Sequence, residues 1–327
     1  MGFLPFVLVS ASACHAAEPC QHAEFSEVHR IGLLYRLQIT PDQAFTFAPF
    51  YQYWWLNENL AQENFEVHRD VGADFRLTIK QLLGNIPHQL VVGWSPRFGE
   101  TQTDVFVNNF GNRGAILQSR FVQAVTWSGF WESQFDLTRR FMLSVGGRLE
   151  YQTRDGGVRG FTGGIASSFR SGYRKFSALS PKLGFVYRTT PTSQRYGNVS
   201  RGYEPPINIQ LIQAVNSSGI PPTEAFIDVD AQRGWQFELG HRGTAFNGDL
   251  MWDLTVFELE LRKEILMTGL TIAGVGEFPT FRNANGTRPT GVEAGGQMVL
   301  WRSLLTPAGP SSRVIRSVFV PPYLVAV

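Results

Sequence analysis

The residues that could do chemistry are few and form no common catalytic or metal-binding pattern. Gly-x-Ser-x-Gly, which exposes a nucleophilic serine, is absent, and so is the zinc-binding His-Glu-x-x-His. Cys14 and His15 lie near Cys20 and His22, but this spacing fits no structural zinc site and no second ligand pair follows. Three further histidines are isolated on expected strands: His68, His88 and His241. We therefore expect no enzyme activity, no cofactor and no bound metal.

Basic and aromatic residues gather in segments that we expect to be loops. Guanidinium groups and aromatic rings together suit a ligand that is anionic and carries an aromatic group. The candidate ligand-binding residues are Arg97, Arg113, Arg154, Arg159, Phe161, Arg170, Tyr173 and Arg174, with Phe169 and Lys175 beside them. The alternative is that these side chains are only solvated or contact lipopolysaccharide.

Composition limits the elements that could position these residues. The chain has 327 residues, of which 13% are aromatic, 33 are glycine and only 17% are charged. Its net charge of +2 gives no overall attraction to nucleic acid. No run of about 18 apolar residues occurs that could form a membrane-spanning helix. Many aromatic residues and glycines with few charges and no long apolar run are typical of a sheet that faces lipid at alternate positions.

Apolar and polar residues alternate along most of the chain, which predicts β-strands. One such strand has an apolar face made of Phe141, Leu143, Val145, Leu149 and Tyr151. About eleven strands are expected, near residues 28–39, 44–55, 68–80, 88–96, 121–136, 141–152, 178–189, 194–203, 233–243, 249–263 and 281–300. Between Val256 and Phe257 the apolar phase shifts by one residue, which predicts a β-bulge there.

The connections between these strands alternate between short and long. The long connections, rich in Gly, Asn, Arg, Ser or Pro, are expected near residues 56–67, 97–120, 153–177, 204–232 and 264–280. Outer-membrane barrels have short turns on the periplasmic side and longer loops outside the cell. The sequence therefore predicts an all-β chain that forms an antiparallel transmembrane β-barrel. A soluble β-protein that binds partners through its loops is the alternative fold.

Several motifs between residues 140 and 300 resemble the barrel of TonB-dependent outer-membrane receptors, and they come in the same order. The clearest are Ser-Pro-Lys-Leu-Gly at 180–184 and Ser-Arg-Gly-Tyr at 200–203, which Pro205 and Pro206 follow. Glu-Leu-Gly at 238–240 and Gly-Val-Glu at 291–293 resemble later strands. The branch of the family that this region resembles most is the siderophore and iron-complex receptors.

The resemblance implies a receptor in the bacterial outer membrane that takes up a ferric siderophore or a similar scarce ligand. Its partners would be that ligand, outer-membrane lipid and the TonB system, which acts through an N-terminal plug. The sequence differs from the family in two ways. Alternation begins near residue 28, which leaves no space for the plug or the TonB-contacting box, and 11–12 strands are about half of a 22-stranded barrel. We therefore expect an incomplete or open barrel that is a fragment of a receptor.

Three regions are expected along the chain. Residues 1–27 would be a leader or an unstructured start, residues 28–302 the barrel region, and residues 303–327 a tail without alternation. Two other functions stay open beside the receptor: a passive porin-like channel, and a truncated barrel that transports nothing.

Overall fold

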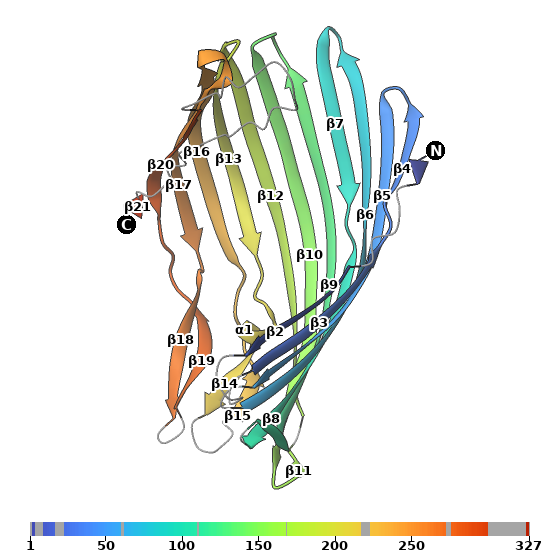
Figure 1. Cartoon of the computed structure of the whole chain (residues 1–327), viewed down its shortest axis with the longest axis vertical. Helices are drawn as coiled ribbons and strands as arrows, with labels where there is room; N and C mark the ends of the chain where they lie inside the picture. The colour runs from blue at the N-terminus through green and yellow to red at the C-terminus, as the bar shows by residue number, and fades with distance from the viewer. Residues whose placement is uncertain are drawn as a thin grey trace, which may run out of the picture.

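The computed structural model describes residues 2–3, 9–16, 23–59, 62–109, 111–167, 169–216, 223–272, 276–299 and 325–326. In this part of the chain no helix is long and apolar enough to cross a membrane. Most of the described residues form antiparallel strands of one strongly curved sheet (Figure 1).

Long strands form the wall, and each pairs with the wall strands that come before and after it along the chain. From the N-terminal side the wall contains β2 (Val9–Ala16), β3 (Ala23–Gly32) with β4 (Tyr35–Thr40), β5 (Gln43–Asn59), β6 (Gln62–Leu83), β7 (Ile86–Trp94) with β8 (Arg97–Asn109), β9 (Asn112–Asp136), β10 (Phe141–Thr162), β12 (Arg170–Thr190), β13 (Ser193–Glu204), β16 (Gln232–Ala245), β17 (Leu250–Arg262) and β20 (Thr290–Met298). β3 and β4 both pair with β5, and β7 and β8 both pair with β6 and β9, so each couple fills one position of the wall. The described wall thus has twelve positions, which confirms the predicted number of strands and their antiparallel pairing.

The wall forms an open trough (Figure 1). Among the described strands, β20 pairs with β17 and with the short β21 (Val325–Ala326), and no pairing joins it to β2. The short β1 (Gly2–Phe3) pairs with β4. The prediction of an incomplete or open barrel is confirmed.

Short turns and long hairpins lie at opposite ends of the trough (Figure 1). The short-turn end holds the connections β4–β5, β6–β7, β9–β10, β12–β13 and β16–β17, the last through the 3-10 turn η1 (Phe246–Gly248). The turn between β6 and β7 is only two residues long and needs the positive φ of Gly84, which is 63°. The alternation of connection lengths along the sequence therefore predicted the two ends correctly.

Most of the expected long loops are strands instead. The pairs β5–β6, β8–β9 and β10–β12 stay hydrogen-bonded almost to their hairpin tips, and β11 (Ile165–Ala166) pairs with the end of β10. β18 (Ile265–Ile272) and β19 (Gly276–Asn283) form a further hairpin within residues 264–283. Alternation fades in these segments because strands that extend beyond lipid have no need of an apolar outer face. The polar, glycine-rich composition was therefore mistaken for loops.

The predicted bulge near Val256 and Phe257 is wrong. β17 pairs without a register shift with both β16 and β20. The apolar phase changes because the surroundings of the outward side chains change along the strand. Val256 is 46% exposed among apolar neighbours, whereas Glu258, two residues further on the same face, forms an ion pair with Arg288. The strand leaves the apolar band at this point without any irregularity in its backbone.

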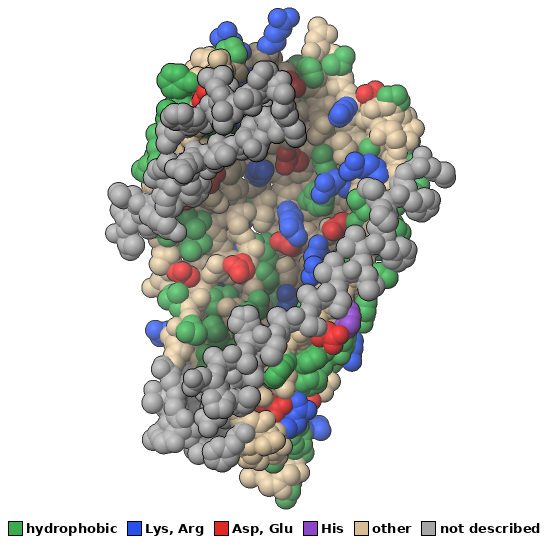
Figure 2. Space-filling model, in the orientation of Figure 1, with side chains coloured by type: hydrophobic (Ala, Val, Ile, Leu, Met, Phe, Trp, Pro, Cys, Tyr) green, Lys and Arg blue, Asp and Glu red, His purple; other side chains and the backbone are tan. Residues whose placement is uncertain are grey.

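The two faces of the wall differ in chemistry. Directly opposed residues of antiparallel strands point to the same side, so the register extends each face across the sheet. The outer face carries exposed large apolar side chains: Trp127, Trp131, Val145, Leu149, Tyr151, Leu179, Leu183, Leu239, Leu254, Val256 and Val292. Figure 2 looks into the hollow, where Lys, Arg, Asp and Glu side chains gather. An apolar outer face and a charged inner face are what a lipid-embedded barrel wall requires.

One connection folds back onto the inner face of the wall. We call the described residues of this connection, 205–216 and 223–231 between β13 and β16, the inner segment; it contains α1 (Asn208–Leu211), β14 (Ile212–Asn216) and β15 (Thr223–Phe226). Leu211 and Val229 are buried against Phe176 of β12. Ile212 packs against Val122 of β9 and its neighbour Val158 on β10. The sequence predicted only a long external loop here.

The boundaries of the expected regions stay predictions. β1, β2 and the start of β3 fall within residues 1–27, the expected leader. Of the expected tail at 303–327, the structure describes only Val325 and Ala326, and the rest lies outside the described residues.

Candidate functional site

Each of the eight predicted ligand-binding residues lies on a strand rather than in a loop. Arg97 begins β8, Arg113 belongs to β9, Arg154, Arg159 and Phe161 belong to β10, and Arg170, Tyr173 and Arg174 belong to β12. Their expected position in loops is therefore wrong, because the hairpins that carry them continue as paired strands. Whether they bind a ligand stays a prediction.

The register divides these eight residues between the two faces. Thr126 and Val158 lie on the inner face, and they are directly opposite Arg97 and Arg170. Arg154 and Arg174 are opposite each other on the same face. The outer face holds the other four, which are Arg113, Arg159, Phe161 and Tyr173. The sequence therefore grouped residues that the wall separates.

The outer residues make cation–aromatic contacts that face away from the hollow. The guanidinium of Arg113 lies 4.5 Å from the centroid of the Phe106 ring and forms an ion pair of 2.6 Å with Glu63. The guanidinium of Arg159 lies 5.7 Å from the centroid of Phe169. A ligand inside the trough does not meet these side chains.

A cavity of about 400 Å³ lies between the inner segment and the wall. We call it the inner cavity. Its roof includes Ile207, Asn208 and Ile209 at α1. Its wall side is lined by Glu66, His68, Asp70, Gly99, Thr101, Thr103, Arg120, Val122, Ala124 and Arg154. Of the eight predicted residues, Arg154 is the one that lines this cavity.

The floor of the inner cavity contains a row of residues that ends in two opposite charges. Asp70 is directly opposite Gly99, Gly99 is opposite Ala124, and Ala124 is opposite Arg154. Three strand spacings place the backbones of Asp70 and Arg154 roughly 14 Å apart. The two middle residues are small, so the space between the charged side chains is not filled from the wall.

The histidine of the inner cavity is held on three sides. Its Nε2 lies 3.0 Å from an oxygen of Glu66, and its Nδ1 lies 3.1 Å from the hydroxyl of Thr101. The ring of His68 stacks on Trp54 with a centroid distance of 3.7 Å. The side-chain amide of Asn208 donates to the Thr101 hydroxyl at 3.0 Å, which ties α1 to the wall. Among the described residues no group of three metal-ligating side chains occurs.

The two arginines of the inner cavity differ in their partners. Arg120 donates to both carboxylate oxygens of Glu224 of the inner segment, at 2.7 and 2.6 Å. Arg154 donates instead to the side-chain oxygen of Gln152 and to the carbonyl of Thr153, both at 3.0 Å. Within the described part of the chain no carboxylate lies within 4 Å of Arg154, so its charge is available to a ligand.

The far side of the inner segment is also held by charges. Asp230 accepts a hydrogen bond of 2.7 Å from Lys263, and both Asp228 and Asp230 form ion pairs with Arg174. The hydrogen bond from Lys263, together with the positive charge of Arg174, lowers the pKa of Asp230. Arg174, predicted to bind ligand, thus holds the inner segment in place.

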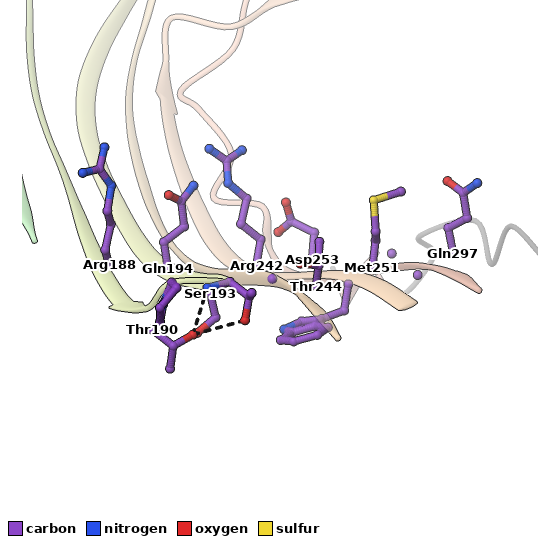
Figure 3. A pocket seen from close by; sticks show the side chains of 15 residues that line it. Arg188, Thr190, Ser193, Gln194, Arg242, Thr244, Met251, Asp253 and Gln297 are labelled. Carbon is purple, nitrogen blue, oxygen red and sulfur yellow. Dashed lines mark hydrogen bonds between the residues drawn. The ribbon is translucent and has the colours of Figure 1, made fainter. Parts of the chain in front are cut away.

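A second, more open cavity of about 610 Å³ lies at the short-turn end of the hollow. Figure 3 shows Arg188, Gln194, Arg242 and Asp253 side by side, pointing into it from β12, β13, β16 and β17. The hydroxyl of Tyr196 donates to Asp253 at 2.7 Å. The sequence did not single out these residues.

The comparison with protein families identifies the chain. The model of the TonB-dependent receptor-like β-barrel matches residues 25–312. The chain belongs to this family. The outer-membrane location expected for the chain is therefore confirmed. No curated protein gives a significant match.

Several solved structures of receptors and transporters share the fold. The ferric-catecholate import receptor Fiu from E. coli K12 has a TM-score of 0.66 at 13% identity, over 86% of this chain and 46% of that one. The siderophore receptor PiuA from Acinetobacter baumannii has a TM-score of 0.63 at 13% identity, over 91% of this chain and 50% of that one. The copper transporter OprC has a TM-score of 0.65 at 13% identity, over 86% of this chain and 46% of that one. The chain thus spans about half of the length of these receptor chains.

Proposed function

We propose that the chain forms the wall of a receptor that takes up a ferric siderophore or a similar scarce chelate across the outer membrane. In this proposal residues 28–302 are the barrel region, and the TonB system supplies the energy to the intact receptor. Membership of the family supports it, and so do the solved relatives, among which are a ferric-catecholate import receptor and a siderophore receptor. No covalent chemistry on the ligand is part of the proposal.

The observation that carries the proposal is the inner cavity. A passive channel would need only a polar lumen. In this chain, by contrast, an apolar core and the Arg120–Glu224 ion pair hold the inner segment against the wall. The docked segment encloses about 400 Å³, which lies within the usual size range of small-ligand sites. A partly enclosed site with an available cation is suited to retaining a scarce ligand that carries an anionic group.

The inward fold of the inner segment also favours a second candidate, a passive porin-like channel. Porins leave an aqueous channel through the barrel, and a segment docked inside the wall would narrow that channel. The two candidates differ in their need for energy, because a receptor coupled to TonB stops when the proton gradient collapses and a channel does not.

One uptake experiment separates the possibilities. The full chain is expressed in a bacterium that lacks its own siderophore receptors, and uptake of a ⁵⁵Fe-labelled siderophore is measured with and without a protonophore. Uptake that the protonophore abolishes supports the receptor. Uptake that persists supports the channel and contradicts the receptor. A chain that reaches the outer membrane but gives no uptake is a truncated barrel without transport function.

A further inference from the structure

The charges that line the inner cavity are matched in pairs, with two exceptions. Arg120 forms its ion pair with Glu224, and Glu66 is hydrogen-bonded to His68. Asp70 and Arg154 form no ion pair and no hydrogen bond to an opposite charge within the described part of the chain; Arg97 lies near Asp70 on the same face, but it forms its ion pair with Asp74. They are one negative and one positive group, and they stand at the two ends of a single cross-strand row.

The carboxylate of Asp70 leans along this row toward Arg154. A Cβ atom added to Gly99 would lie 2.6 Å from Oδ1 of Asp70, so the carboxylate lies over the glycine. Ala124 occupies the next position and adds only a methyl group. The space between Asp70 and Arg154 is therefore open at the floor, and the cavity is roofed by the apolar side chains of Ile207 and Ile209.

We propose that the inner cavity binds a zwitterion, a small ligand or ligand arm with an amine at one end and a carboxylate at the other. The amine would pair with Asp70 and the carboxylate with Arg154, while the chain between them lies over Gly99 and Ala124. An anion or a cation alone would pair with one of the two groups and leave the other, which is partly buried, without an ion pair. Electrostatic complementarity of this kind decides which ligand is selected.

The proposal deepens the receptor function and rests on it, because it names the chemistry of the ligand portion that this cavity accepts. It excludes a ligand whose only charged groups are acidic. Apolar contacts with the roof and the two charges at the ends together favour an extended aliphatic zwitterion, such as an ω-amino acid or a short peptide.

A matched set of three probes tests the proposal on the full chain in detergent. 6-Aminohexanoate carries both charges, hexanoate only the negative one and hexylamine only the positive one. Isothermal titration calorimetry should show 6-aminohexanoate binding roughly tenfold or more tighter than either of the others, because each charged hydrogen bond contributes. Equal affinities for hexanoate and 6-aminohexanoate, or no saturable binding of 6-aminohexanoate, would overturn the proposal.

Variants locate the binding. Asp70→Asn and Arg154→Gln should each weaken 6-aminohexanoate roughly tenfold or more. Arg148→Gln is the control, since Arg148 lies outside the cavity and pairs with Glu150. Circular dichroism of each variant checks that the wall is folded. If the folded Arg154→Gln variant binds as tightly as the parent chain, the site is elsewhere and the proposal is wrong.

Binding at equilibrium needs no transport, so the two proposals fail in different ways. Binding with the expected charge preference but without energy-dependent uptake contradicts the receptor function alone. Energy-dependent uptake without any preference for the zwitterion contradicts the present inference alone.

Discussion

The ion pair between Arg120 and Glu224 should decide whether the inner segment stays docked. Glu224→Gln preserves the size of the side chain and removes its charge. The side chain of Glu224 is 7% exposed and that of Arg120 is 25% exposed, so the change leaves a largely buried guanidinium without a counterion. Breaking a buried pair in this way costs about 3–5 kcal/mol. Because Arg120 is partly solvated and also donates to Gln118, we expect about 2 kcal/mol, roughly a thirtyfold shift of the docking equilibrium.

Hydrogen exchange measured by mass spectrometry in detergent reports this equilibrium directly. The amides of β14 and β15 should lose about thirtyfold of their protection in Glu224→Gln, because the hairpin opens more often. The amides of β9 and β10 form the wall and should keep theirs. Local loss of protection distinguishes undocking of the inner segment from unfolding of the sheet.

The matched control is Arg69→Gln, which removes an ion pair of similar length from the exposed outer face. Arg69 and Glu100 are 2.9 Å apart, but the Arg69 side chain is 50% exposed. Such a surface pair contributes about 1 kcal/mol or less, and its loss should leave the inner segment protected. The reasoning is refuted if β14 and β15 exchange equally in Glu224→Gln and the parent chain, or if both variants lose the same protection.

Three further changes test the packing, the pH dependence and the lipid-facing band. In Gly172→Ala the new Cβ would overlap the ring of Phe226, so overpacking should cost about 1–3 kcal/mol of docking, seen as faster exchange in β15. Since Lys263 lowers the pKa of Asp230, the stabilisation from this pair is present above the unfolded pKa of about 3.9 and is lost as pH falls through the lower folded value. Protection factors of residues 223–231, corrected for intrinsic rates, should therefore fall below about pH 4. Leu149→Arg puts a charge on the apolar outer face, where Leu149 is 56% exposed, and should cost about 2–4 kcal/mol in refolding into liposomes.

Each of these three predictions has a control and a result that would contradict it. Gly295→Ala adds a methyl group where no atom lies within 4 Å, so it should leave exchange unchanged. Asp230→Asn should remove the drop in protection at low pH, and a drop of the same size would mean that another group titrates. Ala178→Arg places the same charge on the inner face opposite Glu150 and should be tolerated in liposomes. Equal costs for both arginine substitutions would contradict the assignment of the two faces.

The sequence predicted the wall well because lipid imposes a strict rule on it. Every second residue of a strand in the membrane must be apolar, so Val145, Leu149 and Tyr151 reveal both the strand and its outer face. Beyond the lipid this rule ends. Glu258 can occupy an outward position there, and the resulting change of phase was read as a bulge although the pairing is continuous.

The inner segment was missed because contacts with residues far away in the sequence hold it in place. Its apolar residues Ile207, Ile209, Leu211 and Ile212 lie close together in the sequence, and Phe226, Ile227 and Val229 follow in the same connection. Such a cluster is the signal that could have found it, because an external loop has no reason to concentrate aliphatic side chains. Its docking partner Phe176 is far away in sequence, and only the register shows that this residue faces the hollow.

The candidate site was predicted only in part, because the sequence does not show which strand positions lie opposite one another. Residue types alone grouped Arg113 and Arg159 with Arg154, but the face of a strand residue depends on the parity of its position relative to the membrane-spanning core. Tyr151 faces lipid, and Arg154 is three positions further along the same strand. Residues an odd number of positions apart point to opposite faces, so the alternation alone could have predicted that Arg154 points inward. Asp70 could not have been matched to it, because the two residues meet through two intervening strands whose register the sequence leaves open.

Docking of the inner segment and binding in the inner cavity are thermodynamically linked. The roof of the cavity belongs to the inner segment, and its floor belongs to the wall, so a ligand that touches both binds the docked state more tightly than the undocked one. Linkage is reciprocal: the ligand must then stabilise docking by as much as docking improves its affinity. The Arg120–Glu224 ion pair, which lies at the edge of the cavity, thus influences affinity without touching the row between Asp70 and Arg154. A chain with a weakened ion pair would have an intact binding row and yet bind its ligand less tightly, because a smaller fraction of molecules has the roof in place.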